Sequence, residues 1–83
     1  MKLIKTFENF HKTPHHIFWD IMEHSFDKHG VTILSHTNAK SVVNFQDALD
    51  VAKMAQEHMN KSPEKCGIIS KIFFDRADEL DKN

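Results

Sequence analysis

Apolar residues between positions 13 and 30 recur with the three- and four-residue spacing of an amphipathic helix. Thr13 can cap the first turn, Pro14 suits the first helical position, and Gly30 can supply a left-handed stop. The pattern predicts one long helix over residues 13–30 with its apolar face in the core. Trp19 lies at the margin of that face on a helical wheel. The large side chains at its centre are Ile17, Phe18, Ile21, Met22 and Phe26.

The residues before this helix predict a second, shorter helix over residues 2–12. The residue before a proline avoids the helical region, so a bend is expected at Thr13 and the two helices should pair. A strand over residues 2–7 is the alternative, because some of the same apolar side chains could face one side of a sheet. The helical stripe consists of Leu3, Ile4, Phe7 and Phe10.

The segment after Gly30 predicts a β-hairpin. Two short runs, residues 31–35 and 41–45, contain β-branched residues, and a polar stretch with a turn at Thr37 and Asn38 separates them. A lone hairpin is weak in water, so this one is expected to pack on the helices.

The C-terminal half predicts a second pair of helices, over residues 45–60 and 62–80. Asn44 resembles a capping residue for the first of them, and Pro63 suits the start of the second. Met54 and Phe74 fall off the apolar stripes, and the acidic end predicts fraying of residues 81–83. The stripe of the first helix is Phe45, Ala48, Leu49, Ala52, Ala55 and Met59, and that of the second is Cys66, Ile69, Phe73, Ala77 and Leu80.

These elements together predict a single domain, residues 1–83, of the α+β class and mostly helical. A helical pair, a β-hairpin and a second helical pair follow one another along the chain. Two alternatives remain open, an all-α fold and a fold with an N-terminal strand in place of the first helix. A chain of 83 residues buries about 60–65% of its unfolded surface, enough for one modest core.

Composition limits the ligands and the cellular location expected for the protein. The formal net charge of −1 argues against indiscriminate binding to phosphate backbones. Cys66 is the only cysteine, so no internal disulfide can form and a reducing compartment is expected. No apolar run has the length of a membrane span or a signal peptide, which predicts a cytoplasmic location. The excess of lysine over its single arginine indicates an AT-rich coding sequence.

No residue pattern predicts catalysis, a cofactor or a metal site. His16, Asp20 and His24 recur every four residues, a spacing that can place metal ligands on neighbouring turns. The HExxH motif is missing, however, and a solvated helix face explains these residues. Cys66 lies beside Lys65 near a helix start, which favours a thiolate, but its position on an apolar stripe predicts a buried thiol.

Protein binding is the function that the sequence favours. Trp19, Met54 and Phe74 are large apolar side chains placed away from the centres of their stripes, and such residues are enriched at protein interfaces. The chain is therefore predicted to be a small inhibitor, adaptor or regulatory subunit with a protein partner, and to form a homodimer.

Nucleic-acid binding is the alternative function. Basic residues near the N-terminus are interleaved with Phe7 and Phe10, and aromatic and basic groups together can stack bases and hold phosphates. The near-zero charge and the acidic outer face of residues 13–30 disfavour a polyanion. The candidate residues are Lys2, Lys5, His11, Lys12 and His15.

Overall fold

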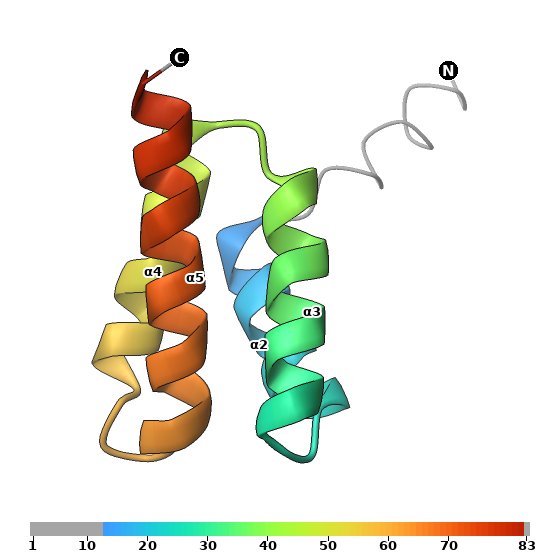
Figure 1. Cartoon of the computed structure of the whole chain (residues 1–83). Helices are drawn as coiled ribbons and strands as arrows, with labels where there is room; N and C mark the ends of the chain where they lie inside the picture. Colours follow the sequence, from blue (N-terminus) through green and yellow to red (C-terminus); the bar gives the residue numbers. More distant parts are fainter. Residues whose placement is uncertain (1–12, 83) are drawn as a thin grey trace, which may run out of the picture.

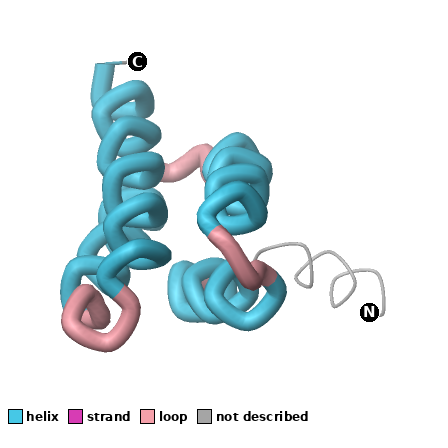
Figure 2. The backbone as a smooth tube through the Cα atoms, turned by 60° about the horizontal axis from the view of Figure 1, so that its bottom comes forward, coloured by secondary structure: helices cyan, strands magenta, loops and turns pink. Residues whose placement is uncertain are grey.

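The computed structural model of the chain describes residues 13–82, and in that range every regular element is a helix. The predicted α+β class is therefore wrong, and the all-α alternative fits. The predicted helix or strand within residues 2–12 lies outside the described residues. Short loops join the helices, as Figure 2 shows. In chain order they are α2 (Pro14–His24), α3 (Lys28–Ser41), α4 (Phe45–Glu57) and α5 (Pro63–Lys82).

The longest helix, α5, packs against α4 on one side and α3 on the other, while α2 lies mainly against α4. The α2–α3 and α4–α5 connections lie at one end of the bundle, and the α3–α4 connection lies at the other end with the C-terminal part of α5 (Figure 1). All four helices contribute fully buried side chains, of which the largest apolar ones are Phe18, Phe73, Ile21, Ile69, Val31 and Val51.

The long helix predicted over residues 13–30 is wrong, because it is divided into two. The Ser25 hydroxyl donates a hydrogen bond to the Ile21 carbonyl oxygen, and the backbone of Ser25 is extended. Asp27 then caps a new helix by accepting a hydrogen bond from the Gly30 amide at 2.9 Å. Gly30 therefore lies in the first turn of α3 instead of ending α2. Phe26, predicted to be a core residue, lies in the connection and is 93% exposed.

The predicted β-hairpin over residues 31–45 is also wrong, because most of this segment forms α3. Val31, Ser35 and Ala39 are buried and recur every fourth residue, so one helix face supplies all three to the core. Four polar side chains bond to carbonyl oxygens one turn earlier, so their polar groups are satisfied within the helix. They are Thr32, Thr37, Asn38 and Ser41.

The two C-terminal helices lie where the sequence predicts them. The Asn44 side chain accepts a hydrogen bond from the Asp47 amide at 3.1 Å, which confirms the predicted cap of α4. The last turn before α5 is not regular helix, because α4 ends at Glu57. α5 continues to Lys82, beyond the predicted start of fraying, and Lys82 is paired there with Asp78 at 3.4 Å.

Candidate functional site

Two of the three predicted partner-binding residues, Trp19 and Met54, lie on the same side of the bundle. His58, which follows α4, links them. The Trp19 ring centroid is 5.2 Å from that of His58 at an interplanar angle of 84°, and His58 Nδ1 lies 2.9 Å from the Met54 carbonyl oxygen. Phe18 extends the aromatic contact into the core, at 5.0 Å from Trp19. Trp19 and Met54 are therefore partly buried where α2 meets α4.

The third predicted residue, Phe74, lies on a different part of the surface. The flank of α5 that meets α3 carries Arg76, whose Nε donates a hydrogen bond to the Val42 carbonyl oxygen at 3.1 Å. Phe74 lies on the opposite flank of the same helix, beside α4, and is only partly covered by the core. The structure thus places Trp19 and Met54 on one side of the bundle, linked through His58, and places Phe74 on another.

Phe45 and Leu49 of α4 lie on the same side of the α4–α5 pair as Phe74. They are one turn apart on the flank of α4 opposite Met54 and His58, the flank that faces α5. The Cys66 thiol of α5 contacts the His58 carbonyl oxygen, so in this antiparallel pair Leu49, nine residues before His58, is level with Asp75, nine residues after Cys66, and lies near Phe74. Phe45 lies one turn further towards the C-terminal end of α5. We call these three residues, Phe45, Leu49 and Phe74, the α4–α5 apolar strip.

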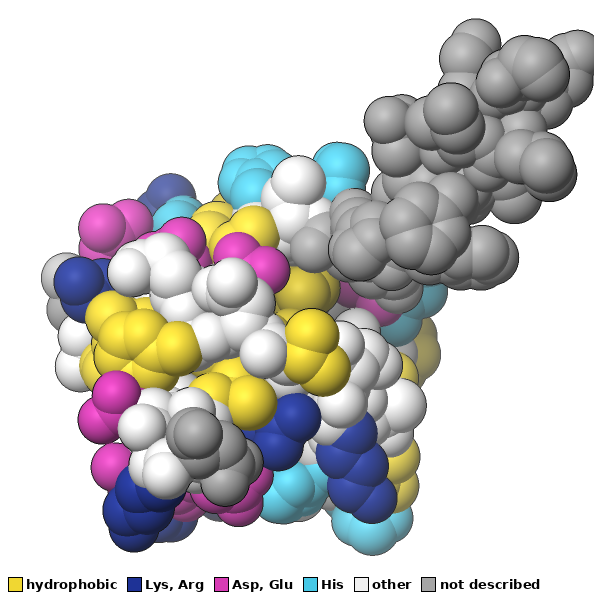
Figure 3. All heavy atoms as spheres, turned by 90° about the horizontal axis from the view of Figure 1, so that it is seen from above, with side chains coloured by type: hydrophobic (Ala, Val, Ile, Leu, Met, Phe, Trp, Pro, Cys, Tyr) yellow, Lys and Arg dark blue, Asp and Glu magenta, His cyan; other side chains and the backbone are white. Residues whose placement is uncertain are grey.

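The strip is incompletely covered. Phe45 is 40% exposed, and Phe74 and Leu49 are of intermediate exposure. Seen from the end at which the C-terminus lies, apolar side chains reach the surface over the neighbouring ends of α4 and α5 (Figure 3). Val43, 79% exposed in the α3–α4 connection, lies at this same end of the molecule.

Among the described residues, the exposed large hydrophobic ones are Phe26, Ile33, Val43 and Phe45. The sequence predicted Phe26 and Phe45 to be core residues, which is wrong, and it did not single out Ile33 or Val43 as exposed. Phe26 was detectable in principle, since Asp27 followed by Gly30 three residues later is a helix-capping pattern that places Phe26 before a helix. Phe45 is the first residue of α4, so no preceding helical turn covers its side chain. No sequence signal marks Ile33, whose exposure depends on α3 being a helix.

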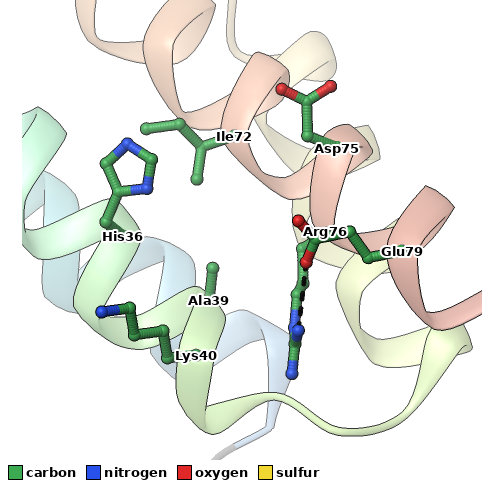
Figure 4. Close-up of a pocket in the computed structure, with 7 residues that line it drawn as sticks. All are labelled: His36, Ala39, Lys40, Ile72, Asp75, Arg76 and Glu79. Carbon is green, nitrogen blue, oxygen red and sulfur yellow. Dashed lines mark hydrogen bonds and ion pairs between the residues drawn. The ribbon is translucent and has the colours of Figure 1, made fainter.

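A pocket of about 220 Å³ lies between α3 and α5 (Figure 4). Two of its charged side chains, Arg76 and Glu79, already have partners within the protein. Arg76 Nη1 lies 3.1 Å from Glu79 Oε1 while its Nε bonds to Val42, so this guanidinium fastens the α3–α4 connection to α5. The pocket is lined by His36, Ala39, Lys40, Ile72, Asp75, Arg76 and Glu79.

The other described residues that could carry chemistry make contacts within the fold. His24 Nδ1 lies 3.0 Å from Asp20 Oδ1, yet within residues 13–82 no three metal-ligating side chains converge. Cys66 is fully buried, and its thiol donates to the His58 carbonyl oxygen at 3.4 Å. Burial raises the pKa of this thiol, and the charge of Lys65 opposes the shift only in part. A buried thiol with a raised pKa is a poor nucleophile.

The nucleic-acid alternative has one described candidate. His15 is exposed on α2, with its ring centroid 6.4 Å from that of Trp19. Lys2, Lys5, His11 and Lys12 lie outside the described residues.

The comparisons with known proteins assign no family. No family model matches the chain, and no curated protein or solved structure shows significant similarity to it. Across residues 13–82, none of the helices has the combination of length and apolar character needed to cross a membrane.

Proposed function

We propose that this chain is a non-enzymatic protein-binding domain that forms a homodimer through the α4–α5 apolar strip. The observation that carries the proposal is the exposure of Phe45 on the same side of the α4–α5 pair as the partly covered Leu49 and Phe74. Burying aromatic surface of this kind stabilises protein interfaces. A twofold dimer would use the same strip on each copy, so that each contact occurs twice.

Trp19 and Met54 lie on a separate side and stay accessible in such a dimer. A homodimer with a free second surface suits a small inhibitor, adaptor or regulatory subunit, which must hold a foreign partner while remaining assembled. A reducing, cytoplasmic setting suits its lone and buried thiol, Cys66.

Two observations support a binding role over an enzymatic one. Arg76, the only arginine in the chain, is bonded to the Val42 backbone and to Glu79 in the pocket between α3 and α5. The thiol of Cys66 is in the core. Within residues 13–82, these two groups therefore serve the fold, and the strip offers apolar contacts that suit binding.

The test is light scattering of the wild type at tens of micromolar, with two aspartate variants. We expect the wild type to have twice the 9.7 kDa chain mass. Phe74→Asp should be a folded monomer, because a charge at the centre of the strip opposes its burial. Ile33→Asp is the matched control, since Ile33 is 50% exposed on α3, away from the strip, and should remain a dimer. A wild type that stays monomeric would refute the proposal.

A further inference from the structure

We propose that the homodimer is antiparallel, with α5 of one copy packed against α5 of a second copy and the twofold axis beside Phe74. This inference rests on the proposed function and specifies the partner and its orientation. It follows from the order of residues along the exposed seam of α5, which consists of Gly67, Lys71, Phe74 and Asp78.

The four seam residues share one side of α5. Their separations of four, three and four residues keep them within a narrow sector of the helix. Lys71 and Asp78 are exposed, whereas Phe74 and Gly67 are partly exposed. A four-three-four spacing keeps these residues along one line of contact with a second helix, with Phe74 as the large apolar residue of that line.

Gly67 leaves room for that second helix. A Cβ at this position would meet no atom within 4 Å, so the surface over the glycine is open. In an antiparallel pair centred beside Phe74, the last turn of the second copy, at Lys82, is level with Gly67. Close backbone approach is possible there because Gly67 presents no side chain.

The charges select the orientation. Lys71 precedes Phe74 by three residues and Asp78 follows it by four. In an antiparallel pair, Lys71 of one copy is level with Asp78 of the second copy, and the reciprocal contact lies across the axis. In a parallel pair, Lys71 would face Lys71 and Asp78 would face Asp78, and both contacts would repel.

Contacts within each copy extend this complementarity. Lys71 Nζ lies 3.7 Å from Asp75 Oδ2, and Lys82 Nζ lies 3.4 Å from Asp78 Oδ2. The antiparallel pair therefore joins two weak surface ion pairs into one network of four alternating charges on each side of the axis. Isolated exposed pairs contribute little, but networks of several charges contribute more. The apolar centre is Phe74 from both copies, flanked by Leu49 of α4.

Charge reversal tests the orientation. Lys71→Glu and Asp78→Lys each place two like-charge contacts in an antiparallel dimer, and each should raise the dissociation constant roughly tenfold or more. The double variant Lys71→Glu/Asp78→Lys should return it to the wild-type value. An equimolar mixture of the two single variants should form heterodimers with wild-type affinity, since both contacts are then of opposite sign. Sedimentation equilibrium measures all four samples, and circular dichroism confirms that each variant is folded.

The outcomes separate this inference from the proposed function. Both fall if the wild type is monomeric. If the wild type is a dimer that Phe74→Asp dissociates, but neither charge variant weakens it, the strip is the interface and the antiparallel arrangement is refuted. Weakening by each single variant without recovery in the double variant would also refute it, because the effect would then come from Lys71 or Asp78 within one copy.

Discussion

Lys65 Nζ of α5 lies 2.8 Å from the Ser25 carbonyl oxygen and 3.3 Å from that of Met22. A single ammonium group thus binds two carbonyl oxygens at the end of α2, where the helix leaves them without backbone partners. This contact joins residues 40 and 43 positions apart in the chain. It holds the α2–α3 connection against the start of α5.

Replacing this lysine should weaken the fold. Lys65→Met keeps the aliphatic stem but removes both hydrogen bonds, and we expect a loss of about 1–2 kcal/mol in the free energy of unfolding. Lys53→Met, on the exposed side of α4, is the control and should change stability little. Urea denaturation measures both. Equal effects of the two substitutions would show that the contact is not stabilising.

Two phenylalanines of the predicted single helix should behave oppositely. Phe18 is fully buried, so Phe18→Ala should cost about 3–5 kcal/mol of unfolding free energy. Phe26 is 93% exposed, and Phe26→Ala should change stability by less than about 0.5 kcal/mol. Thermal and urea unfolding measure the stability of both variants. A large loss of stability in Phe26→Ala would contradict the prediction and would mean that the α2–α3 connection packs in the core.

The two buried serines of α2 and α3 provide a matched pair. Ser35 is fully buried and its hydroxyl has no hydrogen-bond partner among the described residues, so Ser35→Ala should stabilise the protein, by about 1 kcal/mol. Ser25 is buried too, but its hydroxyl donates to the Ile21 carbonyl oxygen, and Ser25→Ala should instead be destabilising, by about 1 kcal/mol. Opposite signs in denaturant titrations are the expected result, and a loss of stability in both variants would mean that Ser35 has a partner.

The thiol of Cys66 should make the fold sensitive to alkaline pH. Because burial raises its pKa in the folded protein, the unfolded chain ionises first, and the protonated thiol contributes its full stability only below that point. This stability should be lost as the pH rises above about 8.5, where an exposed thiol ionises, towards the higher folded value. Cys66→Ala lacks the thiol, so its melting temperature should fall less between pH 7 and 10. Parallel curves for the two proteins would contradict this prediction.

The sequence by itself determined the helices whose signals are local. Thr13 caps α2 by accepting a hydrogen bond from the His16 amide at 3.2 Å, and Asn44 and Pro63 begin α4 and α5 as predicted. The apolar stripe of α5 was readable because each helix turn repeats the same face. The stripe predicted for α4 was correct in its three alanines, but it included Phe45, which is exposed, and left out Val51, which is fully buried. The off-stripe position of Phe74 was readable for the same reason.

Tertiary structure decided the remainder. The β-branched run at Val31 favours a strand locally by a margin of about 1 kcal/mol or less, and burial of Val31 and Ala39 on one helix face outweighs it. The exposure of Phe26 depends on where α2 ends, and the Ser25 hydroxyl and the Lys65 ammonium group fix that point together. Local preference cannot specify such contacts, because Lys65 lies far from α2 in the chain.

The candidate binding residues were likewise decided partly by the sequence and partly by the tertiary structure. The sequence marked Trp19, Met54 and Phe74 as side chains outside their stripes, but it could not show which of them share a surface. That depends on the order in which the helices pack, since α4 meets α2 on one flank and α5 on the other. Packing therefore placed Met54 and Trp19 on the side where α2 meets α4, and placed Phe74 with Leu49 on the side where α4 meets α5.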